Sequence, residues 1–245
     1  MYHFFISPGS VDKDRAIIGG NDYNHIKNVL RMKEGEELSL SDGEGGDYLC
    51  EIESFTDDAV VCIVKEEKAS AAEPAAKFYL FQGLPKQDKL EMIIQKSVEL
   101  GAYEIIPVET SRCVVKYDEK KKQSKLLRWQ KISESAAKQS QRAIVPEVKP
   151  VMKFKEALSY AKELDMCLIP YENYKDISAT KEILKEIKPG MTVGIFIGPE
   201  GGFDEKEVCE AAANGARQIS LGNRILRTET APLMILSVLS FGLEK

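Results

Sequence analysis

Three loops that each follow an expected strand carry the residue types best suited to chemistry. They are IPYEN at 169–173, IGPEGGF at 197–203 and LGNRILRTETA at 221–231. In open α/β sheets, ligands bind outside the carboxyl ends of the strands, so we expect the three loops to share one site. The middle loop holds Gly198, Gly201 and Gly202, which let backbone groups approach a ligand closely. A tight turn before a helix needs one glycine, so three of them favour a ligand site.

The middle loop matches neither of the common motifs that bind nucleotide phosphates. The chain contains no GxxxxGK(S/T) and no GxGxxG, and Glu200 places an acid where phosphate charge would be repelled. The loop therefore suits a ligand whose reactive group is cationic or neutral better than it suits a polyanion.

The elements that must position these loops alternate between strands and helices, which predicts an α/β domain with a parallel sheet. Strands are expected at 78–83, 103–108, 166–169, 192–197 and 218–221, and helices at 88–100, 126–139, 154–164, 177–187 and 204–213. Asp88 with Glu91, and Asp204 alone, are expected to cap the helices that they begin. The last helix, from Pro232, is apolar nearly all round, so it belongs in a core, a subunit interface or both.

Residues 1–70 read as a smaller module rich in β-strands. Strands are expected at 37–40, 47–55 and 59–64, separated by polar turn sequences. One helix is expected at 23–31, capped by Asp22, with Ile26, Val29 and Leu30 on its core face. The polar stretch KEEKASAAEPAAK that follows reads as a linker, which predicts domains at 1–73 and 74–245.

The charge of the chain is unevenly distributed. The net charge is −5, but ten lysines and arginines from Arg112 to Arg142 stand against three acids, so this segment carries +7 and the remainder −12. Such a local basic stripe can hold a phosphate backbone. The alternative is that the lysine-rich sequence EKKKQSK is a solvated loop and helix start.

The cysteines and apolar runs limit the class of protein. Five cysteines are scattered without a CxxC spacing, and there are only two histidines, so neither a disulfide framework nor a metal site is expected. No apolar run reaches the roughly 18 residues of a membrane span. The start, MYHFFISPGS, does not resemble a secretory signal. A reducing, cytoplasmic location is therefore expected.

Six ordered motifs resemble those of a known family. GPEGGF at 198–203 and LGNRILRTETA at 221–231 closely resemble the signature of the ribosomal RNA small subunit methyltransferase E family. Four further segments are similar to its other motifs: His25 with VLR at 29–31, LPKQDKLEMIIQKSVELG at 84–101, TSRCVVK at 110–116, and QSQR at 139–142 ahead of Val145-Pro146. Lys138 departs from the family pattern, in which an acid is expected before Gln139.

The resemblance implies a fold and an activity. It implies a PUA-like, RNA-binding β-barrel at 1–73 and a SPOUT methyltransferase domain at 74–245, whose last segment threads a trefoil knot. It further implies a homodimer that binds S-adenosyl-L-methionine and methylates a uridine N3 in 16S ribosomal RNA, within assembled 30S particles. A related enzyme acting on another RNA such as tRNA, and a non-catalytic RNA-binding assembly factor, are the alternatives.

The resemblance also assigns residues to roles. The cofactor would be lined by Leu168, Ile169, Pro170, Tyr171, Ile197, Gly198, Pro199, Gly201, Gly202, Leu221, Gly222, Ile225, Leu226, Arg227 and Thr228. For the chemistry, Glu200 and Glu229 are the acids in the right loops, and Arg227 or Arg112 could stabilise charge on the uracil. Glu229 could equally cap the last helix, and Leu221, Ile225 and Leu226 could be plain core. RNA contacts are expected from Arg31, Lys86, Arg112, Lys116 and Arg142.

Overall fold

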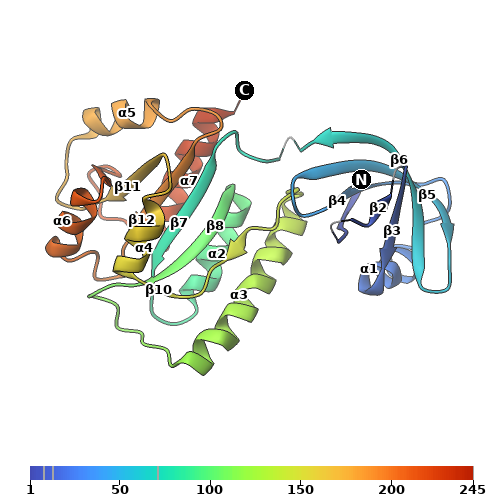
Figure 1. Cartoon of the computed structure of the whole chain (residues 1–245), viewed down its shortest axis with the longest axis horizontal. Helices are drawn as coiled ribbons and strands as arrows, with labels where there is room; N and C mark the ends of the chain where they lie inside the picture. Colours follow the sequence, from blue (N-terminus) through green and yellow to red (C-terminus); the bar gives the residue numbers. More distant parts are fainter. Residues whose placement is uncertain (8, 13, 71, 245) are drawn as a thin grey trace. The chain divides into compact units, whose positions relative to one another are not determined.

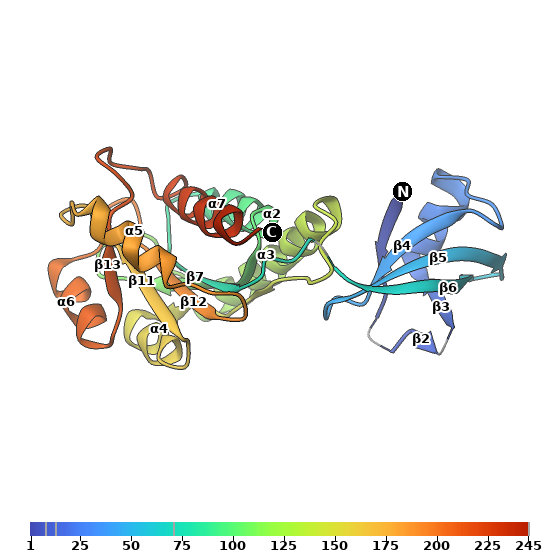
Figure 2. The same ribbon diagram turned by 90° about the horizontal axis from the view of Figure 1, so that it is seen from above.

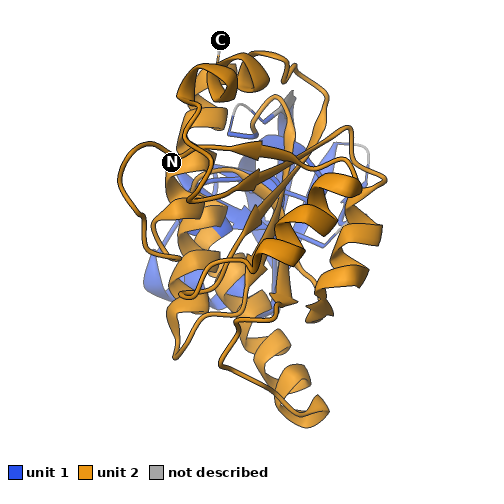
Figure 3. Cartoon of the chain, turned by 90° about the vertical axis from the view of Figure 1, so that its left-hand side faces the viewer, with its two compact units in different colours: residues 1–73, 137–145 blue, residues 74–136, 146–245 orange. Residues whose placement is uncertain are grey.

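The chain folds into two compact units, shown in different colours in Figure 3. The computed structural model describes residues 1–7, 9–12, 14–70 and 72–244. Unit 1 comprises Met1–Glu73 and Ala137–Val145, and unit 2 comprises Pro74–Ala136 and Pro146–Lys245. The first division falls at the expected position between residues 73 and 74. The return of residues 137–145 to unit 1 was not anticipated from the sequence.

Unit 1 is built on a six-stranded sheet in the order β1-β4-β5-β6-β3-β2. Its strands are β1 (Tyr2–Phe5), β2 (Val11–Asp12), β3 (Arg15–Gly19), β4 (Glu37–Ser41), β5 (Gly46–Phe55) and β6 (Ala59–Ala69). Alternate residues are buried on β3 and β4, as expected for strands with one face toward a core. β6 extends to Ala69, so the first residues of the expected linker lie in a strand.

The helical turn of unit 1 differs from the expectation. A short α1 (Gly20–Asn24) leads into a π-helical turn, η1 (His25–Val29), in which the Leu30 amide donates to the carbonyl of His25. The wider turn advances each side chain by a smaller angle than an α-helix does. Ile26 is therefore buried, but Val29 is 64% exposed. Asp22 does not cap a helix, and its carboxylate instead accepts a hydrogen bond from Lys138.

Glu73 holds the returning segment 137–145 in unit 1. Its carboxylate accepts hydrogen bonds from the Arg142 guanidinium and from the backbone amides of Ala143 and Ile144. Arg142 is only 2% exposed. Because this guanidinium is buried and paired, it cannot contact RNA phosphates in this arrangement, and the expectation for Arg142 is corrected.

Unit 2 contains a seven-stranded sheet in which every strand pair is parallel. Its order is β10-β8-β7-β12-β11-β13, and β9 also pairs with β8. The strands are β7 (Lys77–Gly83), β8 (Ala102–Glu109), β9 (Glu147–Val148), β10 (Met152–Lys153), β11 (Met166–Pro170), β12 (Thr192–Ile197) and β13 (Arg217–Ile219). The expected α/β class with a parallel sheet is confirmed.

Helices cover both faces of this sheet. They are α2 (Lys89–Glu99), α3 (Glu119–Gln139), α4 (Phe154–Ala161), α5 (Ile177–Lys185), α6 (Glu205–Ala213) and α7 (Ala231–Leu243). Figures 1 and 2 show α2 and α7 on one side of the sheet and α4 and α6 on the other. On the latter side, Phe154 and Val208 pack against Phe81 and Phe196 from the central strands. This double covering leaves the strand ends as the place for a site.

The expected helix caps have different outcomes. Asp204 caps α6 as expected, and Glu207 completes a capping box with it. Asp88 precedes α2 but makes no side-chain capping bond, because its carboxylate pairs with Lys125. α3 begins at Glu119, inside the lysine-rich stretch and earlier than expected.

The last helix, α7, is buried on only one side within a single chain. Ile235, Leu236 and Leu239 are buried, whereas Val238 is 46% and Phe241 is 80% exposed. A core position alone therefore does not account for its apolar sequence. No helix in the described parts of the chain has both the length and the apolar character of a membrane span.

Candidate active site

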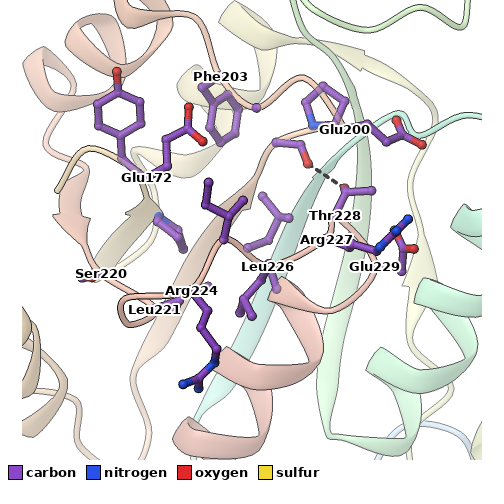
Figure 4. A pocket seen from close by; sticks show the side chains of 18 of the residues that line it. Glu172, Glu200, Phe203, Ser220, Leu221, Arg224, Leu226, Arg227, Thr228 and Glu229 are labelled. Atoms are coloured by element: carbon purple, nitrogen blue, oxygen red, sulfur yellow. Dashed lines mark hydrogen bonds between the residues drawn. The ribbon is translucent and has the colours of Figure 1, made fainter. Parts of the chain in front are cut away.

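A cavity of about 340 Å³ lies at the carboxyl edge of the parallel sheet. β12, β11 and β13 are neighbours in the sheet, and the loops after all three strands contribute to its lining (Figure 4). The start of α2 contributes as well. The three loops therefore meet in one place, as their positions after parallel strands predict. The size is typical of a site for a small molecule.

The glycines of the middle loop allow the backbone to pack against itself. A Cβ on Gly198 would lie 3.0 Å from backbone atoms of Gly202, and Gly202 itself has a φ of +66°. A Cβ on Gly83, at the end of β7, would lie 2.6 Å from Pro199. Larger residues would thus force the loop away from β7. The glycines are therefore needed partly for the packing of the loop against itself and against β7. This packing sets the shape of the loop at the cavity.

A buried hydrogen-bond relay joins the third loop to the second loop and to β7. The Thr228 hydroxyl donates to the carbonyl of Gly198 at 2.7 Å and accepts from Nε2 of Gln82 at 3.0 Å. Gln82 is fully buried and Thr228 is 5% exposed. The first of these bonds is drawn in Figure 4. The relay fixes the edge of the cavity where segments far apart in sequence meet.

Two carboxylates from different loops converge on one ammonium group in the cavity wall. Lys89 Nζ lies 3.2 Å from Oε1 of Glu200 and 3.3 Å from Oε2 of Glu229. Glu200 also accepts hydrogen bonds from the backbone amide of Lys86. Oε2 of Glu229 is buried, and its contact among the described residues is the Lys89 ammonium.

The partners of Glu200 outweigh the effect of burial on its ionisation. Burial alone would raise the pKa of Glu200, but backbone amides and the Lys89 ammonium stabilise the carboxylate, and its pKa lies below the ordinary value. Reciprocally, the hydrogen bond to Glu200 raises the pKa of Lys89. Glu200 and Lys89 are therefore both charged at neutral pH.

Comparison with known proteins identifies the family. Residues 72–240 match the family of the RNA methyltransferase domain, and residues 18–65 match that of the RNA methyltransferase PUA domain. The chain is 42% identical to ribosomal RNA small subunit methyltransferase E of Bacillus subtilis, over 93% of this chain and 90% of the relative. The chain belongs to the ribosomal RNA small subunit methyltransferase E family.

Two further relatives extend the comparison. The member from Mesomycoplasma hyopneumoniae is 32% identical, over 97% of this chain and 98% of the relative. A crystal structure of the Neisseria gonorrhoeae member, bound to S-adenosyl methionine, superposes with a TM-score of 0.80 at 32% identity, covering 98% of this chain and 97% of that one. The likeness thus extends over both units, and the PUA-like and methyltransferase assignments of the resemblance are confirmed.

Most residues that the family resemblance assigned to the cofactor do line the cavity. They are Pro170, Tyr171, Ile197, Gly198, Pro199, Gly202, Leu221, Gly222, Ile225, Leu226, Arg227 and Thr228. Leu168 and Ile169 are instead fully buried within β11, upstream of the loop. Gly201 faces the side chain of Arg112. These three positions support the cavity from outside and do not form its wall.

The four residues proposed for chemistry separate into two groups. Glu200, Glu229 and Arg227 line the cavity, and the exposed Arg227 guanidinium has no ion-pair or hydrogen-bond partner among the described residues. Arg112 lies behind the middle loop, where it donates to the carbonyl of Gly201 at 3.0 Å and pairs with Asp204. The structure therefore makes Arg112 a support for the loop.

Several lining residues were not identified from the sequence as site residues. They are Lys89, Glu172, Lys175, Phe203, Ser220 and Ala231. Glu172 and Ala231 stand in loops that had been singled out, so proximity along the chain could have indicated them. Lys89 lies at the start of a helix and far from those loops in sequence. Only the pairing of β7 with β12 brings it to the site.

The candidate RNA contacts also differ in availability. Lys86 and Lys116 in unit 2 are exposed, and neither side chain has an ion-pair partner in the described part of the chain. Arg31 in unit 1 is exposed and adopts a positive φ of 54°, which is uncommon for a residue with a side chain. Arg31, Lys86 and Lys116 remain candidates for phosphate contact.

Proposed function

We propose that this RNA methyltransferase transfers a methyl group from S-adenosyl-L-methionine to N3 of a uridine in 16S ribosomal RNA. The observation that carries the proposal is the convergence on one cavity of three strand-end loops, two of which carry family motifs. A relative at 32% identity whose structure contains S-adenosyl methionine supports the choice of cofactor. The names of the curated relatives support the small ribosomal subunit as the source of the RNA.

The residues around the cavity fit that cofactor. Leu221, Ile225 and Leu226 offer apolar surface for an adenine ring. The wall carries both signs of charge: the carboxylates of Glu172, Glu200 and Glu229 suit the positive sulfonium and the ribose hydroxyls, and Lys175, Arg224 and Arg227 suit the carboxylate of the methionine part. When bound, the cofactor supplies a methyl group on a positively charged sulfur, which is susceptible to nucleophilic attack.

The chain's own groups can prepare the uridine for reaction. N3 of uracil carries a proton that must leave before the nitrogen can accept a methyl group, and Glu200 and Glu229 are the carboxylates in the cavity wall. The unpaired Arg227 guanidinium can stabilise negative charge on the uracil oxygens as the proton leaves. Holding both reactants in one cavity supplies the proximity that the transfer needs.

Assembly and substrate form part of the same proposal. The exposed apolar side chains Val238 and Phe241 on α7 suit a homodimer interface, in which this face would be covered. Arg31, Lys86 and Lys116 would contact RNA within assembled 30S particles. The trefoil knot remains a prediction of the family resemblance. A ribosomal substrate places the activity in the cytoplasm.

The proposal is tested by incubating the protein with radiolabelled S-adenosyl-L-methionine and 30S particles that lack the modification, followed by mass spectrometry of the RNA. Label on a uridine N3 of 16S RNA is the expected result. Label only on tRNA, supplied in a parallel reaction, would overturn the substrate assignment. Calorimetry with the cofactor is the control, because a non-catalytic assembly factor would give neither label nor binding.

A further inference from the structure

Lys89 is the cavity residue whose position is hardest to explain by folding alone. It is the first residue of α2, at the positive end of the helix dipole, where a cation is unfavourable by roughly 0.3–1 kcal/mol. Asp88 before it makes no capping bond that would offset this. Its side chain is only 26% exposed and reaches Glu200 and Glu229. The position therefore costs helix stability and connects two cofactor loops.

We propose that Lys89 is a positioning residue for methyl transfer, whose ammonium holds Glu200 and Glu229 together and keeps Glu229 in place as the acceptor of the uridine proton. This inference rests on the proposed function. It adds to the proposed function a residue outside the three strand-end loops and a division of labour between the two acids.

The hydrogen bonds of the two acids indicate that division. Glu200 is occupied by the Lys86 amide and by Lys89, so it serves to anchor the loop after β12 to the loop after β7. Glu229 has no backbone donor among the described residues and contacts only the Lys89 ammonium there, and its side chain is 17% exposed. It therefore retains the capacity to accept a proton from a ligand in the cavity.

The surrounding charges show why Lys89 is needed. The charged groups that line the cavity with Glu229 are Lys89 on α2, Glu200 on the loop after β12, Arg224 and Arg227 on its own loop, and Glu172 and Lys175 after β11. Because Lys89 is shared, the two carboxylates lie close to each other. Without the ammonium, like charges in a partly buried wall would repel, and the two carboxylates would move apart.

The step that Lys89 supports is balanced in atoms and electrons. The N3 proton passes to an oxygen of Glu229, and the nitrogen electron pair bonds to the methyl carbon. The carbon–sulfur bond breaks with its electron pair remaining on sulfur, which becomes neutral. Glu229 then releases the proton to water.

The first test compares Lys89→Met and Lys89→Arg with Lys96→Met. Lys96 lies on the same helix and pairs with Glu99, outside the cavity lining, so its replacement is the matched control. For Lys89→Met we expect kcat to fall by about tenfold or more, while the Kd for the cofactor stays within about threefold of the wild-type value. Lys89→Arg keeps the positive charge and should restore kcat.

Two kinetic results would overturn the inference. One is a kcat for Lys89→Met within twofold of the wild type. The other is a lower kcat that Lys89→Arg does not restore, since a merely structural lysine would give that pattern. A further variant sharpens the test: once Glu229→Gln has removed the charge, adding Lys89→Met should lower kcat by less than about threefold, because the two residues act as one unit.

A second test requires no methyl transfer. Urea unfolding of the wild type and Lys89→Met is measured from pH 8 downward. Because the pKa of Glu200 is depressed in the folded chain, the stability it contributes is present above its ordinary pKa and lost as pH falls through the folded value. The difference between the urea midpoints of the wild type and Lys89→Met should therefore become smaller at acid pH. A difference that does not change with pH would contradict a stabilising contact between Lys89 and Glu200. A smaller difference at acid pH in a protein that methylates no RNA would defeat the proposed function while leaving that contact intact.

Discussion

The carboxyl edge of the sheet in unit 2 and the basic segment 112–142 both gather charged side chains, but in different states. At the sheet edge, the guanidinium of Arg227 faces a cavity without a partner in the described chain. Along the basic segment, six of the ten bases are paired with acids, and these are Arg112, Lys122, Lys125, Arg128, Lys138 and Arg142. A cluster of basic residues in a sequence therefore overstates the positive charge that a phosphate can meet, because acids distant in sequence neutralise part of it.

If free charge at the sheet edge is what matters for chemistry, replacing Arg227 should have the largest effect. We expect Arg227→Ala to lower methyl transfer by about 100-fold or more, as loss of a group that stabilises developing charge does. The cofactor Kd should stay within an order of magnitude. Arg217→Ala, which removes a surface ion pair with Glu186, is the control. Equal turnover by the wild type and Arg227→Ala would defeat the comparison.

The buried pair of the basic segment should act on stability instead. Arg142→Ala leaves the Glu73 carboxylate without its cation in the interior of unit 1, which should lower the free energy of unfolding by about 3 kcal/mol. Lys138→Ala breaks the more exposed pair with Asp22 and should cost under about 1 kcal/mol. Urea denaturation measures both. If the two variants lost similar free energies of unfolding, burial would not be what distinguishes the Arg142 ion pair from the Lys138 ion pair.

The relay at the sheet edge offers an intermediate effect. Thr228→Val removes the hydroxyl between Gln82 and Gly198. The Gly198 carbonyl loses this donor and Gln82 keeps only its bond to the Gly83 carbonyl, so stability should fall by about 1–3 kcal/mol. Cofactor affinity should fall as well, because the loops lose their mutual anchor. Thr228→Ser retains the hydroxyl and should remain close to the wild type in thermal unfolding and calorimetry. If Thr228→Ser bound the cofactor more weakly than Thr228→Val does, the hydroxyl would not be what anchors the loops.

The smallest effects are expected for single lysines, and they distinguish free from paired cations. Lys116→Ala should reduce the slope of log affinity for RNA against log salt by about 1, if this exposed lysine contacts a phosphate. Lys122→Ala, which removes a cation already paired with Glu109 and Glu119, should leave the slope unchanged. Filter binding over a salt series measures this. Equal slopes for all three proteins would remove Lys116 from the RNA surface.

The parts of the fold that sequence could predict are those specified by local pattern. The strand at 192–197 and the Asp204 cap were both predicted correctly, because alternation of strands and helices and a capping side chain act within a few residues. Glycine loops after parallel strands likewise predicted the cavity. The π-helical turn at 25–29 could not be predicted, because its hydrogen bonds shift by one residue without any proline or glycine to mark it.

The failures at the site concern side chains whose partners are distant in the chain. Arg112 was expected near the substrate, but its role depends on Gly201 and Asp204, about ninety residues later. In the same way, the role of Arg142 depends on its ion pair with Glu73. The role of Lys89 depends on its ion pairs with Glu200 and Glu229. No local periodicity specifies such pairs, so the charge of a residue is visible in the sequence but its availability is not.

The return of residues 137–145 to unit 1 has a consequence for how the chain matures at the ribosome. When residue 73 has been synthesised, Glu73 still lacks the guanidinium and the two amides that it binds in the finished fold. Unit 1 therefore completes its interior only after more than half of the polypeptide has emerged. A fragment ending at residue 73 should be less stable than its compact boundary suggests, and adding a peptide that spans 137–145 in trans should restore part of the loss.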